Sequence, residues 1–420
     1  MSATLESSQR LAKNSLSLWL NPIHMRFYPT RCPATVLIAL ALLAPVAARC
    51  DGGGFVQCRP GPWGRIQYQT IYLSAPDTIL DEFPLPQPQS IWSFPNSNAD
   101  AVQALLLKVG IEKDVCDRLL ADHRSKRDEE GNLSLYPTLA DVEALKPEVR
   151  TALYRELAKS PMNVFHHDPA YIPGGNLDEW LVGTNLPDSA VQVIRKLAWK
   201  DGNTMMFSDF RALLSLATSD SEARRWLKVL TRTRAVIAFL KVDGTDNLPV
   251  LKRYWSANFN RNDSLPLLKA MSDLPGGGVI DLTHLLPPIP RRLAYAYTTP
   301  DLDRMGQVPN CHWTSLNFFN YTRQNIFLNL KLAASQVLED YDTVTDQATF
   351  GDILFFLDKD GGAYHSCVYL ADDLVFTKNG ENNVMPWIIT RLDDVKELYM
   401  HDHPGAAIQV YRRRWPVESN

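Results

Sequence analysis

Residues 349–380, TFGDILFFLDKDGGAYHSCVYLADDLVFTKNG, constrain the fold of this chain more than any other stretch. Short apolar runs (ILFF, CVYL and LVF) alternate there with turns built from Gly, Asp and Asn. Runs of this length, bounded by such residues, are typical of consecutive strands joined by tight turns. An apolar-faced helix is expected earlier in the chain, in NCHWTSLNFFN. This order predicts an α+β fold, with a helix ahead of an antiparallel sheet.

The remainder of the chain divides into further segments that differ in the spacing of their apolar residues and in composition. The 420 residues, 45% of them hydrophobic, suffice for two or three domains with cores of their own. From Asn98 onward, apolar residues recur at the three- and four-residue spacing of helices. We predict an export signal at 1–48, an extended Pro-rich segment at 49–97, a helical domain at 98–232, a small α/β connecting segment at 233–299, and the helix-and-sheet domain at 300–420.

The N-terminal region has the pattern of a cleaved export signal. Basic residues precede an apolar run at 34–43, and small residues lie at signal-peptidase spacing before a cut near Ala48. The first 24 residues are polar, so we expect translation to start at Met25. The apolar run is short and Pro45 follows it, which argues against a permanent membrane span. The expected location is therefore periplasmic or extracellular.

Charge and cysteine content narrow the function classes. A formal net charge of −4 with dispersed basic residues argues against a nucleic-acid partner. Six cysteines are too few for a disulfide scaffold in a chain of this length, although Cys50 and Cys58 could pair after export. Cys116 lies in a helical apolar stripe and is expected to be buried. The histidines lack partners at metal-ligand spacing, so we expect neither a metal nor a cofactor.

Cys311 has the sequence context of a nucleophile. It follows a segment rich in Gly, Pro and Asn and precedes apolar positions, which places it in the first turn of a helix. Backbone N–H groups at a helix start favour a thiolate, and the same groups can hold the oxyanion of an acyl-transfer reaction.

A general base would come from a distant part of the sequence. His365 enters the strand HSCVYL from a Gly-rich turn, where its ring could face a cleft. A third polar group should hold the imidazole by its other nitrogen, and the next strand offers Thr377, Lys378 and Asn379. Asp352, in contrast, is expected to stabilise a turn, and His312 is not expected to be the base.

The order NCHW, FGDILFF, HSCVYLADDLVF resembles the NlpC-type cysteine peptidases, papain-like enzymes that cut peptide bonds in bacterial peptidoglycan. The resemblance covers roughly the last third of the chain. It implies that Cys311 is the nucleophile and His365 the general base. The family's third polar residue falls near Thr377 in a plain alignment, whereas Asn379 has the more suitable chemistry and is preferred here.

The resemblance and the predicted signal together imply an exported cysteine hydrolase that cleaves peptides of the cell wall. Two alternatives remain open at this point. The C-terminal domain could be a catalytically inactive papain-like binding module, with the helical region carrying the function. It could also be an amidase or acyltransferase of the same chemistry that acts on a substrate outside the wall.

Overall fold

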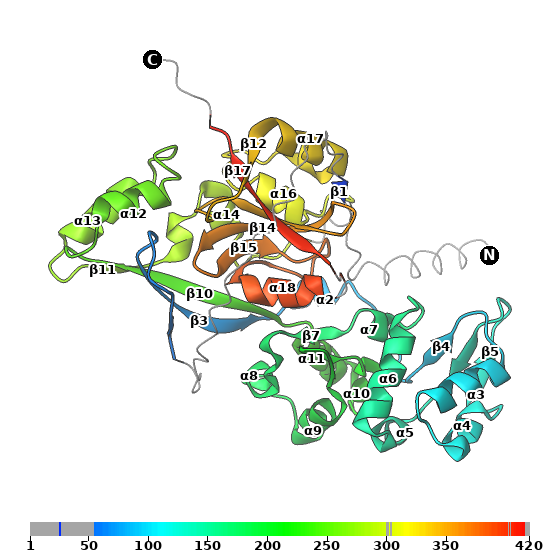
Figure 1. Ribbon diagram of the computed structural model, residues 1–420. Coiled ribbons are helices and arrows are strands. Elements are labelled where there is room, and N and C mark those ends of the chain that lie inside the picture. The colour runs from blue at the N-terminus through cyan, green and yellow to red at the C-terminus, as the bar shows by residue number, and fades with distance from the viewer. Residues whose placement is uncertain are drawn as a thin grey trace.

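The computed structural model describes residues 25–26, 54–299, 302, 305–401, 403 and 405–415. Within them the chain is a mixed α+β protein, in which helices pack on antiparallel sheets as the sequence predicts (Figure 1). Of the predicted export signal, only the short strand β1 (Met25–Arg26) belongs to the described part, where it pairs with β14. The signal and its cleavage site otherwise lie outside the described residues.

The C-terminal region is built on one antiparallel sheet with the strand order β12-β17-β13-β14-β15-β16. The strands are β12 (Tyr341–Val344), β13 (Ile353–Leu357), β14 (Gly362–Ala371), β15 (Leu374–Lys378), β16 (Trp387–Arg391) and β17 (Ala407–Arg413). The hairpin between β13 and β14 is closed by Asp358, whose carboxylate accepts the N–H groups of Asp360 and Gly362 at 2.9 and 2.7 Å. The predicted consecutive strands are thus confirmed.

Helices cover both faces of this sheet. They are α14 (Pro288–Leu293), α16 (Cys311–Leu316), α17 (Leu330–Asp340) and α18 (Leu392–Met400), with a 3₁₀ turn at Asn325–Leu328. Two consecutive residues of β14 belong to different hydrophobic clusters. Val368 packs in the core that includes Trp313 of α16, whereas Cys367 packs with Val395 of α18. The side chains of β14 therefore point alternately toward α16 and toward α18.

A second sheet has the order β11-β10-β3-β2 and lies beside the first (Figure 1). Its elements are β2 (Val56–Gln57), β3 (Arg65–Leu73), β10 (Thr233–Val242) and β11 (Gly278–Asp281), accompanied by α12 (Leu248–Trp255), α13 (Leu265–Asp273) and a 3₁₀ turn at Leu282–Leu285. The predicted strand and helix of the connecting segment are present as β10 and α12. Segment 49–97, expected to be extended, supplies β3, which pairs with β10 from Arg65 to Leu73.

The helical region has a separate core, formed by residues between Trp92 and Leu230. Its helices are α3 (Ala99–Lys108), α4 (Lys113–Leu120), α5 (Leu139–Ala144), α6 (Pro147–Ala158), α7 (Val164–His167), α8 (Leu177–Leu181), α9 (Asp188–Leu197), α10 (Phe210–Leu214) and α11 (Asp220–Leu230), while α2 (Asp77–Leu80) precedes them. Two small sheets, which the sequence analysis did not predict, lie among the helices. They contain β4 (Trp92–Phe94), β5 (Ser125–Arg127), β6 (Leu133–Leu135), β7 (Ala170–Ile172), β8 (Trp199–Asp201) and β9 (Thr204–Phe207).

A buried ion pair lies where the helical region contacts the C-terminal region. Arg234 of β10 binds Asp394 of α18, and both side chains are less than a tenth exposed. The same guanidinium donates to Glu179 of α8 and to Thr70 of β3, each at 3.2 Å. One arginine therefore joins the C-terminal region to the ribbon of β3 and β10 and to the helical region.

Candidate catalytic site

Cys311 is the first residue of α16, as the sequence predicts. The preceding Asn310 is extended, and its side chain accepts the backbone N–H of Trp313 at 2.9 Å, which caps the helix. The amide nitrogen of the same side chain donates to Glu381 at 2.9 Å. These contacts fix the start of α16 against the loop that follows β15.

The thiol of Cys311 is buried, with 7% of the residue exposed. Burial raises the pKa of the thiol to about 11, whereas a hydrogen bond from the backbone N–H of Ser366 acts in the opposite direction. The pairing of β14 with β15 begins at Ala371↔Leu374 and ends at Val368↔Phe376. Cys311 contacts β14 beyond the end of this pairing, at Ser366. The thiol therefore lies against the backbone of the residue that follows His365.

His365 is completely buried between two aromatic side chains. Its ring stacks on Tyr399 of α18, with centroids 3.7 Å apart and planes at 15°, and meets Phe356 of β13 edge-on at 5.3 Å. Burial, and secondarily the nearby His312, holds the pKa of His365 well below its usual range. The imidazole is thus neutral in this arrangement.

The partner of the imidazole is Thr377, because its Oγ1 lies 3.3 Å from Nε2 of His365. From the sequence we expected Asn379 in this role, but the Oδ1 atom of that residue is buried without a hydrogen-bond partner among the described residues. Lys378 is also buried, and its ammonium donates to the carbonyl groups of Gly380 and Asn382. Of the three candidates, Thr377 is the one in contact with the ring.

His365 and Ser366 are neighbours in β14 and point to opposite faces of the strand. Ser366 faces α16, where its hydroxyl contacts Nδ1 of His312 and the hydroxyl of Ser315, both at 3.0 Å. His365, the neighbouring residue in the strand, therefore points to the other face, toward Tyr399. Its Nδ1 atom has no hydrogen-bond partner among the described residues, so it is not hydrogen bonded to the thiol of Cys311.

Other predicted residues take the structural roles expected of them. The carboxylate of Asp352 accepts hydrogen bonds from the backbone N–H of Thr349 at 2.9 Å and from Nε and Nη2 of Arg412, which stabilises the turn before β13. Cys367 lies buried with a free thiol on the same face of β14 as His365. Cys116 is buried in the helical core. Cys50 lies outside the described residues, so its pairing with Cys58 stays a prediction.

Two groups at the site escaped the sequence analysis. Tyr399 stacks on the imidazole from α18, a contact that depends on tertiary packing and has no local sequence signal. Ser366 appeared only as the residue after the base, yet its N–H meets the thiol and its hydroxyl ties His312 and Ser315 together. Tyr399 therefore contacts the imidazole, and Ser366 contacts the thiol.

The arrangement holds a neutral thiol at the backbone N–H of Ser366 and a neutral imidazole on the preceding residue, His365. One nitrogen of this imidazole has no hydrogen-bond partner within the described part of the chain. A proton can pass from such a thiol to an unpaired ring nitrogen once the two approach, and the resulting thiolate is a nucleophile. The described residues contain no group of three His, Cys, Asp or Glu side chains able to hold a metal ion. In that same part of the chain, no helix combines the length and apolar character needed to span a membrane.

Comparison with protein-family models, with curated proteins and with solved structures finds no match to this chain.

Proposed function

We propose that the C-terminal region is a cysteine hydrolase in which Cys311 and His365 carry out acyl transfer to water. The observation that carries the proposal is the surroundings of His365. Its Nε2 is held by Thr377, its Nδ1 is without a described partner, and the thiol of Cys311 lies against the next backbone N–H. A papain-like fold for this region belongs to the same proposal.

The proposed reaction begins with transfer of the thiol proton from Cys311 to Nδ1 of His365. The sulfur then bonds to an amide carbonyl carbon, while backbone N–H groups of Cys311 and its neighbours stabilise the oxyanion. His365 returns its proton to the leaving amine as the C–N bond breaks. Water, deprotonated by His365, releases the acyl group and restores the thiol.

Catalysis requires an opening of the closed site. In the closed arrangement burial raises the thiol pKa to about 11 and keeps the imidazole neutral, so substrate must displace the ring of Tyr399 or shift α18. The proposed substrate class, peptides of the bacterial cell wall, rests on the sequence resemblance and on the predicted export. An amide outside the wall would undergo the same chemistry.

The closed, uncharged pair also supports a second candidate, a catalytically inactive papain-like module that binds its partner without cleaving it. Reactive cysteines occupy electropositive, partly exposed surroundings, whereas buried neutral thiols are inert. In this candidate the stacking of His365 on Tyr399 is a permanent part of the core.

Digestion of purified peptidoglycan, followed by mass analysis of the soluble products, separates the candidates. The hydrolase should release fragments that Cys311→Ala no longer produces. Cys116→Ala is the matched control, because it removes a buried thiol from the other core. Unchanged peptidoglycan with the wild-type protein would overturn the wall substrate, and equal release by the wild type and Cys311→Ala would overturn the catalytic role of Cys311.

A further inference from the structure

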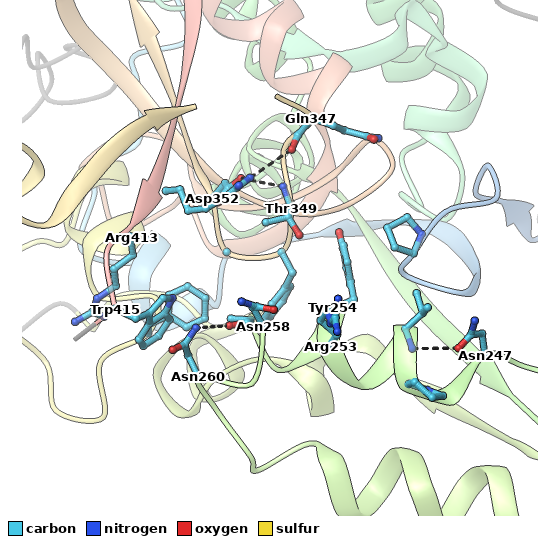
Figure 2. Close-up of a pocket in the computed structure, with 18 residues that line it drawn as sticks. Asn247, Arg253, Tyr254, Asn258, Asn260, Gln347, Thr349, Asp352, Arg413 and Trp415 are labelled. Carbon is cyan, nitrogen blue, oxygen red and sulfur yellow. Dashed lines mark hydrogen bonds and ion pairs between the residues drawn. The ribbon is translucent and has the colours of Figure 1, made fainter. Parts of the chain in front are cut away.

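A second candidate site lies away from Cys311, in a cavity of about 770 Å³. Figure 2 shows three segments that surround it: α12 with the turn after it, the loop at 347–352 before β13, and the end of β17 through Trp415. Small-molecule sites in proteins commonly have a volume of this order. Neither Cys311 nor His365 lines the cavity, so it belongs to a different part of the surface.

The turn after α12 has a strained backbone. Three consecutive residues other than glycine, Ala257, Asn258 and Phe259, have positive φ angles of 50, 58 and 67°. A hydrogen bond from the N–H of Asn258 to the carbonyl of Arg253, 2.8 Å long, holds the turn in place. Such strain persists where a particular placement of side chains is required, often at ligand sites. Here the turn places Asn258 and Asn260 in the cavity wall (Figure 2).

Aromatic side chains form another part of the wall. Trp415 meets Phe319 edge-on at 5.0 Å, and the guanidinium of Arg413 lies 5.1 Å from the centre of the Trp415 ring. Phe319 is itself held close to Gly351, where even a Cβ atom would lie 2.0 Å from the phenyl ring. The position of Trp415 is therefore fixed by its neighbours, as is typical of an aromatic surface used for packing against a ligand.

The charge of the lining is positive. Asp352, a carboxylate in the wall, already accepts hydrogen bonds from Nε and Nη2 of Arg412. Arg253 is exposed, and its guanidinium has no hydrogen bond or ion pair with any other described side chain. Figure 2 shows Arg253 beside Tyr254 on α12, in the same cavity wall as Asn258. The cavity thus offers an unpaired cation next to aromatic rings and amides.

We propose that this cavity binds an acidic saccharide, a sugar that carries a carboxylate. The apolar C–H face of a sugar ring packs on an aromatic side chain such as Trp415. The amides of Asn258 and Gln347 suit hydroxyl groups, since an amide both donates and accepts hydrogen bonds. A carboxylate on the sugar pairs with Arg253, whose planar guanidinium matches it in geometry. This site is independent of the chemistry proposed for Cys311.

The test uses a disaccharide that contains one uronic acid and the same disaccharide with its carboxyl group reduced to an alcohol. Binding is followed by titration calorimetry and by tryptophan fluorescence of the full chain. The acidic form should bind at least tenfold more tightly than the reduced form. Arg253→Gln should remove that difference, and Trp415→Leu should weaken both forms. Cys311→Ala should leave binding unchanged, which separates this proposal from the proposed hydrolase.

Lys252→Gln is the matched control, because it removes a positive charge from the adjacent residue of α12 without altering the cavity wall. Equal binding of the acidic and reduced disaccharides would overturn the charge recognition. Binding of acetate as tight as that of the acidic disaccharide would overturn the saccharide class. The absence of binding by either disaccharide at millimolar concentration would overturn the site altogether.

Discussion

Replacing Thr377 by Val tests how the imidazole of His365 is held. The substitution keeps the branched shape of the side chain but removes the hydroxyl that lies 3.3 Å from Nε2. The ring is completely buried, so Nε2 would be left without a partner in an apolar setting. Leaving a buried polar group unpaired costs about 1–3 kcal/mol. Because 3.3 Å is a long hydrogen bond, we expect the lower part of that range, about 1–2 kcal/mol.

The same loss should appear in activity if the hydrogen bond selects the reactive orientation of the ring. A change of about 1–2 kcal/mol in the activation barrier corresponds to a rate that is lower by about 5- to 30-fold. Urea unfolding, followed by circular dichroism and by tryptophan fluorescence, measures the stability term. Release of fragments from peptidoglycan measures the rate. A ¹⁵N spectrum of histidine-labelled protein would report the tautomer of His365, which should become mixed in Thr377→Val.

Asn379→Leu is the matched control for this prediction. The Oδ1 atom of Asn379 is buried without a partner among the described residues, so an apolar side chain of similar size should leave stability unchanged or raise it. Its rate should stay within twofold of the wild type. Should Asn379→Leu impair the rate as strongly as Thr377→Val, or should Thr377→Val behave like the wild type, the assignment of Thr377 as the group that holds the ring would be refuted.

Three further predictions concern the framework of the site. Arg234→Met should lower the free energy of unfolding by about 3–5 kcal/mol, because it leaves the buried Asp394 unpaired. Asp394→Leu in the same chain should restore much of this loss. Urea unfolding of the single and double variants measures the loss and the recovery. Gly351→Ala should cost about 2–4 kcal/mol, since φ is +91° and the new Cβ would meet Phe319, and a melting temperature equal to that of the wild type would contradict this. Burial lowers the pKa of His312 to about 4, so below about pH 6.5 the unfolded chain binds more protons than the folded chain, and the free energy of unfolding decreases as the pH is lowered. His312→Asn should therefore remove about 2 kcal/mol of the stability loss between pH 7 and pH 5. Equal pH slopes in urea unfolding of the wild type and His312→Asn would refute the last prediction.

The sequence was sufficient for those features that depend on local patterns. The polar turn before an apolar face predicted that a helix begins at Cys311, and Asn310 caps it there. The apolar run CVYL, bounded by turns, predicted the strand that is present as β14. Both predictions follow from residue periodicity and capping, which short segments carry by themselves.

The orientation of the imidazole could not be predicted in the same way. The pairing of β14 with β15 shifts register between Tyr369 and Ala371, and such a bulge decides which residue of β15 meets His365. Chemical suitability favoured Asn379, yet strand geometry brings Thr377 to the ring. Register depends on the partner strand, so the residues of β15 alone do not determine it.

Contacts between residues far apart in the chain could likewise not be predicted from the sequence. Segment 49–97 was expected to be extended, but nothing in its sequence identifies β10 as the partner of β3. The stacking of Tyr399 on His365 depends on how α18 packs across the sheet. The closed state of the site therefore became apparent only in three dimensions.

The pH dependence of Cys311 alkylation tests the central claim, that His365 serves this thiol, without requiring a known substrate. The rate at which iodoacetamide modifies Cys311 is measured by peptide mass analysis from pH 5 to pH 10, in the wild type and in His365→Ala. If the imidazole accepts the thiol proton when the site opens, the wild-type rate below pH 8 should exceed that of His365→Ala at least tenfold, with an additional inflection at acidic pH. Superimposed profiles with one inflection above pH 9 would contradict the claim and leave the inactive binding module as the remaining candidate.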